Sequence, residues 1–250
     1  MLRIPFLLIC LFTLSLNAQN TAIGVGEKLT FTASYNMSGV LTDLAEVTME
    51  TSAVKTSKAT LLRLKCRATT YSKWDNFFKI RDLYESYVNP KTLTPYLYNR
   101  DINEGSYYKN MKYTFSHKTK TVKTVQKKKK TTENKTVKIN SGTKDIISTL
   151  YSLRTFDFTQ LSIGTNKVFT ILFDRKEVKG KVTYLGKETI STAIGKKTCY
   201  KIKIESYSSS TLNGTLWLTA DANKIPVYGK FKIPVGNGEL KIKSATGLKN

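Results

Sequence analysis

Residues 144–158 are the feature that most constrains the fold, because only there does the sequence show a clear helical period. Apolar residues recur at spacings of three and four, which places them on one face of a helix; they are Ile146, Ile147, Leu150, Tyr151 and Leu153. A side-chain oxygen of Asp145 or Thr143 can cap the first turn. A lone helix with so wide an apolar face is unstable in water, so we expect it to pack on a sheet.

Most of the remaining chain alternates apolar and polar residues, which is the period of a half-buried strand. Clear examples are residues 27–35, 60–71 and 197–207, and the Gly-Asn-Gly at 236–238 predicts a tight hairpin turn. The sequence therefore predicts a mainly-β fold: a strongly curved antiparallel sheet or incomplete β-barrel packed around one central helix of about residues 144–156. No linker or repeat interrupts the pattern, which predicts a single domain over residues 24–248.

The N-terminus has the pattern of a secretory signal peptide over residues 1–18. Arg3 precedes an apolar run, and Ala18 is a small residue at a suitable cleavage position. The run is short for a stable membrane span, although an uncleaved N-terminal membrane helix is the alternative. We predict an exported protein of the periplasm, within the cell envelope, that does not span the membrane after cleavage.

Two cysteines, Cys66 and Cys199, remain once the signal peptide is removed. In an oxidising compartment they can form a disulfide, and the alternative is two buried thiols that pack as small apolar groups. The sequence has a single histidine, His117, and no C-x-x-C pair. We therefore expect no metal site and no cofactor.

The chain carries 41 Lys and Arg against 18 Asp and Glu, a net charge of +23, which favours anionic surroundings. The most basic region, residues 118–138, is rich in Thr and Val and predicts a long hairpin with lysines at its tip. The hypothetical polyanion-binding residues are Lys127, Lys128, Lys129 and Lys130. Alternatively, these lysines only keep a strand edge soluble. Export argues against nucleic acid as a partner.

Motifs for catalysis are missing from the sequence. There is no G-x-S-x-G, no glycine-rich phosphate loop and no dinucleotide fingerprint. His117 adjoins the lysine-rich hairpin, and the sequence suggests no nucleophile for it to activate. Asp82 and Glu85 lie close to Arg81 in the sequence, which is typical of a structural ion-pair group. We predict that the protein is not an enzyme.

A ligand site is hypothesised from four residues: Arg81, Tyr151, Arg154 and Trp217. In this hypothesis the two arginines grip an anionic head group at the mouth of an apolar cavity, and the aromatic residues line it. The alternative is a structural polar network in which Asp82 pairs with Arg154 while Asp145 caps the helix.

Four short segments, 26–29, 80–95, 145–154 and 217–227, occur in an order that resembles the bacterial exported family called domain of unknown function 3108. The resemblance implies a cell-envelope protein without an established activity. It also implies a curved antiparallel sheet around a helix, similar in architecture to the periplasmic lipoprotein carriers. The lysine-rich hairpin departs from the family pattern.

Three functions fit these observations. The first is a monomeric, non-enzymatic envelope protein that holds a lipid or another amphiphilic or acyl-bearing ligand. The second is an interaction module whose lysine-rich hairpin docks on an anionic envelope polymer, either polysaccharide or lipid head groups. The third is an unrecognised hydrolase.

Overall fold

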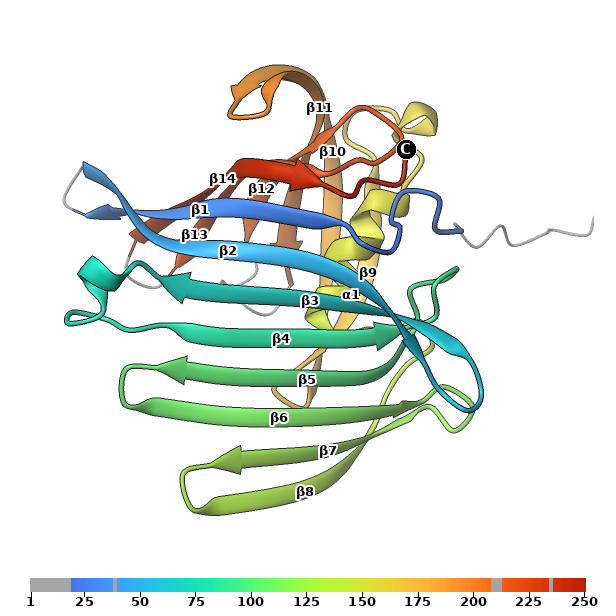
Figure 1. The fold of residues 1–250 in the computed structure, drawn as a ribbon. Helices are drawn as coiled ribbons and strands as arrows, with labels where there is room; N and C mark the ends of the chain where they lie inside the picture. Colours follow the sequence, from blue (N-terminus) through green and yellow to red (C-terminus); the bar gives the residue numbers. More distant parts are fainter. Residues whose placement is uncertain (1–18, 38–39, 208–212, 234–235) are drawn as a thin grey trace, which may run out of the picture.

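The computed structural model describes residues 19–37, 40–207, 213–233 and 236–250, so the predicted signal peptide lies outside the described residues. Fourteen antiparallel strands form one sheet in the order β8-β7-β6-β5-β4-β3-β2-β1-β14-β13-β12-β11-β10-β9 (Figure 1). The strands are β1 Lys28–Met37, β2 Val40–Lys55, β3 Thr60–Thr70, β4 Arg81–Val88, β5 Pro95–Glu104, β6 Tyr107–Ser116, β7 Thr121–Lys128, β8 Thr131–Lys138, β9 Asn166–Phe173, β10 Lys176–Thr192, β11 Gly195–Ser206, β12 Gly214–Thr219, β13 Pro226–Ile233 and β14 Gly236–Thr246.

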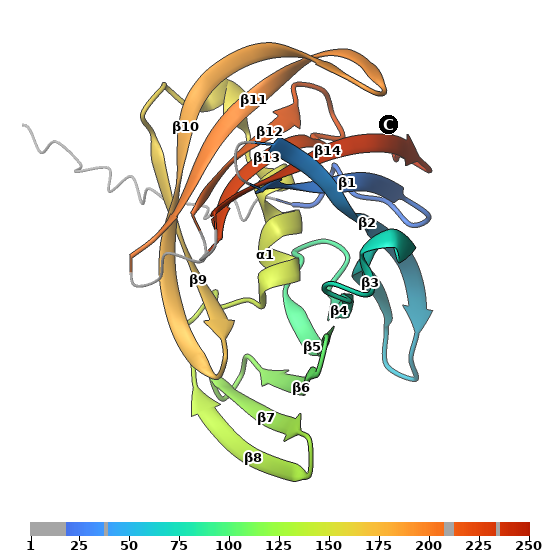
Figure 2. The ribbon, with the colours of Figure 1, turned by 90° about the vertical axis from the view of Figure 1, so that its left-hand side faces the viewer.

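The sheet curves around α1 (Ile146–Ser152), and β8 and β9 remain as its two edges (Figure 2). Three short 3₁₀ turns complete the secondary structure of the described residues: η1 Ser72–Trp74, η2 Leu153–Thr155 and η3 Phe158–Gln160. The curved antiparallel sheet around a central helix, not closed into a barrel, confirms the predicted fold class. Among the described residues, no helix has the length and apolar character needed to cross a bilayer.

The helix begins where the sequence predicts, because the Asp145 carboxylate accepts a hydrogen bond from the Ser148 backbone N–H at 2.8 Å. It ends earlier than predicted: α1 stops at Ser152, continues as η2 to Thr155, and then the backbone extends. Its buried hydroxyls bond to its own carbonyls, such as Thr149 Oγ1 to the Asp145 oxygen at 2.7 Å. Such hydroxyl groups weaken helix propensity but let a polar helix be buried.

The apolar residues of α1 and the turns after it face two directions. Ile147 and Tyr151 are buried in a large cluster that includes Leu29, Phe31 and Leu64 from the first half of the sheet. After α1, Leu153 and Phe158 are buried in a second cluster with side chains of β10, β11 and β12. One short segment therefore provides the packing partner for both halves of the sheet, which is why the sheet must curve around it.

A buried ion pair holds this segment in place. Arg154 donates two hydrogen bonds to the Glu27 carboxylate, each 2.6 Å long, and the two side chains are 1% and 0% exposed. Arg154 also donates to the backbone oxygen of Asn223 at 3.0 Å and lies over the Tyr151 ring at 5.7 Å. The hypothesis that Arg154 pairs with Asp82 is therefore wrong, since its partner is Glu27 at the start of the sheet.

The turn between β9 and β10 contacts the other end of the sheet order through side chains. Asp174 accepts hydrogen bonds from Arg100 on β5 at 2.9 Å and from Lys109 on β6 at 2.8 Å. The next residue, Arg175, pairs with Glu133 on β8 at 2.7 Å. Burial alone would raise the pKa of Asp174, but the hydrogen bonds and charges of Lys109 and Arg100 hold it below its usual value. These contacts connect strands that do not share a backbone ladder.

Two turn predictions have different outcomes. The lysine-rich hairpin is confirmed: β7 and β8 pair from Thr121 to Lys138, and the tip lies at Lys129, whose φ is 46°. The hairpin predicted at 236–238 is present as the β13–β14 pair, but these three residues already belong to β14 and do not form its turn. Gly238 is needed there for space, since a Cβ would lie 2.3 Å from the Phe231 ring.

We predict that replacing Arg154 with Leu destabilises the fold by about 3–5 kcal/mol, because the Glu27 carboxylate is left buried without its partner. Urea unfolding of the protein measures the loss. As a control, Arg81→Ala breaks the partly exposed Asp75 pair and should cost much less stability than the Arg154 change. The double variant Glu27→Leu with Arg154→Met should recover much of the stability; equal losses in the single and double variants would contradict a buried pair.

We also predict that the helix cap Asp145 makes the stability of the protein depend on pH. Burial raises the pKa of Asp145, so the folded state binds this proton more readily than the unfolded state. The stability that Asp145 contributes to the folded state is therefore greatest below its unfolded pKa, and it is lost as the pH rises through its folded pKa. Asp145→Asn keeps a capping oxygen without the charge, so its stability relative to wild type should improve as the pH rises above about 4, the unfolded pKa. Unfolding curves across that range test this, and a constant difference would contradict it.

Candidate ligand-binding groove

An apolar groove of about 200 Å³ lies beside α1, between the helix and the second half of the sheet, β9 to β14. Its walls come from α1 and η2, from β9, and from the inner faces of β11, β12 and β13. The apolar lining residues are Ile146, Leu150, Leu153, Phe169, Ile171, Ile204, Leu216 and Phe231. Leu150 is 36% exposed although it sits in the middle of the helix, so the groove is accessible along this side of α1.

Two aromatic rings of the groove lie over glycines of the neighbouring strands. Phe231 on β13 is paired with Gly214 on one side and with Gly238 on the other. Phe169 on β9 is paired with Gly180, where a Cβ would lie 2.5 Å from the ring. Because a glycine has no side chain, each ring can lie close to its neighbouring strand. The glycine positions therefore help to determine the shape of the groove.

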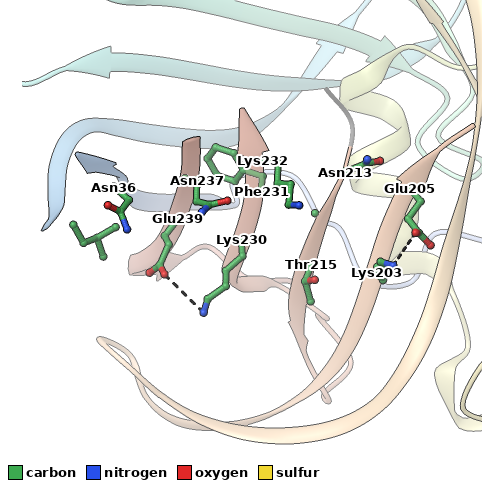
Figure 3. Close-up of a pocket in the computed structure, with 13 residues that line it drawn as sticks. Asn36, Lys203, Glu205, Asn213, Thr215, Lys230, Phe231, Lys232, Asn237 and Glu239 are labelled. Carbon is green, nitrogen blue, oxygen red and sulfur yellow. Dashed lines mark ion pairs between the residues drawn. The ribbon is translucent and has the colours of Figure 1, made fainter. Parts of the chain in front are cut away.

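A second, polar hollow of about 550 Å³ adjoins the groove at the ends of β11 to β14 (Figure 3). The two hollows share five lining residues, which are Asn213, Gly214, Thr215, Lys230 and Phe231. Lys203 forms a 2.7 Å pair with Glu205, whereas Lys230 approaches Glu239 only to 3.8 Å. Lys232 has no carboxylate within ion-pair distance in the part of the chain that the structure describes. The groove is therefore lined mainly by apolar side chains, whereas the second hollow carries three lysines and two glutamates.

The four residues predicted to bind a ligand are not brought together. Arg81 pairs with Asp75 at 2.5 Å, at the start of β4. Arg154 is buried against Glu27, and Tyr151 is fully buried beside it with a hydroxyl that has no partner among the described residues. Neither arginine forms the mouth of a cavity, so the hypothesis of a polar mouth made by Arg81 and Arg154 requires correction.

Trp217 also lies away from the groove. It is 6% exposed, its indole N–H donates to Glu188 at 3.0 Å, and its ring packs on Tyr228 at 4.8 Å. Its neighbours in β12, Leu216 and Leu218, face the opposite side of the strand. The period of two therefore puts Leu216 in the groove and Trp217 outside it.

The predicted polar network divides into two separate parts. Asp145 caps α1 and also accepts from the Ser86 hydroxyl at 2.6 Å, which ties the helix to β4. Asp82 accepts from the Asn103 backbone N–H at 2.9 Å instead of contacting Arg154. Burial raises the pKa of Asp82, and that of the nearby Glu104 is raised as well, first by burial and then by the charge of Asp82. Both parts stabilise the sheet rather than line the groove.

Cys66 and Cys199 are free thiols in β3 and β11, so the structure does not form the disulfide considered from the sequence. The two strands are separated in the sheet order by β2, β1, β14, β13 and β12. Burial raises the pKa of the Cys66 thiol to about 12 and that of Cys199 to about 11. Both sulfurs therefore stay protonated near neutral pH, and a protonated thiol is a poor nucleophile.

The candidate catalytic groups are engaged elsewhere. The His117 Nε2 lies 2.6 Å from the Pro95 carbonyl oxygen, and its ring stacks on Phe115. Asp82 and Glu85 are three residues apart on β4 and so face opposite sides, with Glu85 paired to Arg63. No cluster of metal-ligating side chains occurs among the described residues.

The groove residues contributed by the sheet were not identified from the sequence. Phe169, Ile204, Leu216 and Phe231 follow the ordinary alternation of strands and look like any core residue. A usable signal exists in the spacing of the glycines, because Gly214 and Gly238 are the residues that leave room beside Phe231. Only the strand register reveals that they are neighbours.

The fold and the groove define a class: an open antiparallel β-wrap around one short helix, with an apolar groove beside it. By its sequence, the chain belongs to the family described as "Protein of unknown function (DUF3108)", whose model matches residues 30–243. None of the curated proteins matches this chain.

Among the solved structures that are similar to this chain, one supports the fold. A β-barrel-like protein of the family DUF1849 from Brucella abortus is similar at 10% identity with a TM-score of 0.59, covering 89% of this chain and 97% of the other. A candidate exported protein with a YmcC-like fold from Bacteroides fragilis and a candidate lipoprotein from Parabacteroides distasonis have TM-scores of 0.37 and 0.34. Each is 10% identical and covers 89% of this chain and 96% of its own. Only the first likeness is strong enough to support a shared fold.

We predict that Gly238→Ala forces the Phe231 ring out of its position, because the new methyl group would lie 2.3 Å from that ring. The expected loss of stability is about 1–3 kcal/mol, as for other overpacked sites. In a Phe231→Ala background the same change should cost little, since the ring is gone. Urea unfolding of the four proteins in this cycle measures the coupling. Equal losses in both backgrounds would contradict the packing described.

Proposed function

We propose that this protein holds an amphiphilic or acyl-bearing molecule of the cell envelope and does not change it chemically. The observation that carries the proposal is the apolar groove beside α1, which shares five lining residues with a second hollow that carries three lysines. A molecule with an apolar tail and an anionic head matches that arrangement. The binding residues proposed here replace the pair of arginines suggested by the sequence.

The tail would lie in the groove against Leu150, Leu216 and Phe231. A volume of about 200 Å³ is smaller than the roughly 300–1,000 Å³ of sites for drug-sized ligands, which favours a narrow chain over a ring system. Each methylene group removed from water contributes about 0.8 kcal/mol, so even part of an acyl chain would bind measurably. The apolar lining offers few groups that could orient a polar molecule.

The head group would lie in the adjoining hollow near Lys230 and Lys232. Lys230 is held only loosely by Glu239 at 3.8 Å, so an anionic group can compete for it. A lysine ammonium with three donors suits a carboxylate or a phosphate. Glu205 and Glu239 in the same hollow would disfavour a head group of high negative charge.

The proposed location is the periplasm, on the basis of the export signal predicted for residues 1–18. We propose that residues 24–248 act as one domain there, which is supported by the membership of all fourteen strands in one sheet. A holding role, without catalysis, is supported by the engagement of His117 and of the two thiols in packing.

We predict that Leu150→Glu weakens binding of a fluorescent fatty-acid analogue by about tenfold or more, because it places a carboxylate against the proposed tail. Leu150 is 36% exposed, so the change should leave the melting temperature nearly unaltered. The matched control is Leu248→Glu, which is 37% exposed and does not line the groove. Fluorescence titration of the three proteins measures the affinities.

Protein purified from its own envelope supplies the second measurement. Native mass spectrometry and solvent extraction should find one acyl-bearing species with the wild type and the Leu248 variant, and much less with the Leu150 variant. Wild-type protein that carries no such species and does not bind the fluorescent analogue would contradict the proposal.

A further inference from the structure

The connection between β3 and β4 presents two phenylalanines to solvent. Phe77 is 81% exposed and Phe78 is 53% exposed, which is unusual for side chains without any polar group. Trp74 packs edge-on against Phe77 with ring centres 5.8 Å apart, and Lys73 lies over the Trp74 ring. Lys79 follows directly, so the aromatic group is flanked by lysines.

This connection is held firmly to the sheet. The Trp74 indole N–H donates to the Asp43 carbonyl oxygen on β2 at 2.8 Å. The backbone N–H groups of Phe77 and Phe78 both donate to the Trp74 oxygen, and Asp75 pairs with Arg81. The exposed rings therefore belong to an ordered structure that presents them outward.

The turn between β5 and β6 and the turn between β7 and β8 lie at the same end of the sheet, because an antiparallel sheet reverses at every turn (Figure 1). Gly105, in the turn between β5 and β6, donates its N–H to the Lys79 oxygen at 2.7 Å. Tyr107 and Tyr108 after that turn are 46% and 40% exposed, and Val40 at the start of β2 is 66% exposed. Aromatic and aliphatic side chains are therefore concentrated at this end.

The lysine-rich tip between β7 and β8 adjoins the aromatic residues. Lys127 pairs with Asn110 on β6, two residues beyond Tyr108. Lys127 to Lys130 are exposed at the tip. Four acidic groups lie nearby. Asp75 pairs with Arg81, Glu133 pairs with Arg175, Glu104 lies beside the bridge to Ile80, and Asp101 lies by the Tyr108 hydroxyl. The end of the sheet therefore combines protruding apolar rings with a strong positive charge.

We propose that this end of the sheet, formed by Trp74, Phe77, Phe78, Tyr107, Tyr108 and the lysines of the β7–β8 tip, docks on an anionic lipid bilayer. The two phenylalanines enter the boundary between head groups and acyl chains, and Trp74 and the tyrosines lie at the level of the head groups. The lysines lie over the lipid phosphates. A polysaccharide would satisfy the lysines but offers no apolar layer for phenyl rings, which is why the lipid surface is favoured.

The proposal concerns a different surface from the groove and can fail independently of it. The lining of the polar hollow includes Asn36 near the end of β1 and Leu41 near the start of β2, which lie at the same end of the sheet. Docking would therefore bring that hollow near the bilayer, where an amphiphile is found. The groove variant Leu150→Glu should nevertheless bind membranes as well as the wild type does.

Sedimentation with vesicles tests the proposal, using phosphatidylcholine vesicles with and without phosphatidylglycerol. We predict that the wild type binds the anionic vesicles and is released by high salt. Phe77→Ser with Phe78→Ser should weaken partitioning by about 100-fold, and changing Lys127, Lys128, Lys129 and Lys130 to Gln by about 100-fold. The matched control changes Ile163 and Val168 to Ser, which are 74% and 65% exposed but lie outside this end; it should bind like the wild type. Melting temperatures confirm that each variant folds.

Acyl chains labelled with bromine add a readout of depth, because they quench only nearby tryptophans. The protein has two tryptophans, and Trp74 should be quenched while the buried Trp217 is not. Wild type that does not sediment with anionic vesicles would overturn the proposal. So would a phenylalanine variant that binds as tightly as wild type while only the lysine variant loses binding, since that result indicates a soluble anionic polymer as the partner.

Discussion

One short helical segment must serve as the packing partner for both halves of a fourteen-stranded sheet. A sheet of this width cannot bury its apolar face while it stays flat, and the described residues include no second α-helix to cover it. Tyr151 packs against the first half and Leu153 against the second. The curvature of the sheet, its open edges and the groove beside α1 all follow from this single constraint.

Two groups of charges stabilise the curved arrangement where backbone pairing does not. The Arg154–Glu27 pair joins the end of the helical segment to the start of β1, and Asp174 joins the β9–β10 turn to β5 and β6. A buried pair contributes little net stability compared with an apolar substitute, but it is costly to break and has strict geometry. Its role here is to fix where the helical segment sits, and hence which side of α1 stays open.

The sequence predicts the parts of the structure that depend on local periodicity. Alternation identifies the strands, the three- and four-residue spacing identifies α1, and the capping role of Asp145 follows from its place before an apolar run. The lysine-rich hairpin is also local, since its strands adjoin in sequence.

The candidate site depends on contacts that no local pattern encodes. Arg154 and Glu27 are 127 residues apart, so the chain gives no sign that they pair. Gly238 belongs to a Gly-Asn-Gly sequence that is typical of a turn. It lies in a strand, where the Phe231 ring occupies the space that a side chain would need. The sequence pattern places Leu150 on the same apolar face as Tyr151, but in the structure Leu150 is 36% exposed beside the groove and Tyr151 is fully buried. Strand register and tertiary packing therefore determine the groove, and sequence periodicity shows only that its residues are apolar.

The claim that the open side of α1 receives a ligand is tested most directly by photo-crosslinking. The probe is a fatty acid with a photoreactive group on its chain, and peptide mapping locates the label. A single helix wrapped by an open sheet, with its free side available to a ligand, predicts labelled peptides from α1 and from β12 and β13, around Leu150, Leu216 and Phe231. Labelling confined to the first half of the sheet, or spread over the outer surface without enrichment at these peptides, would contradict the account.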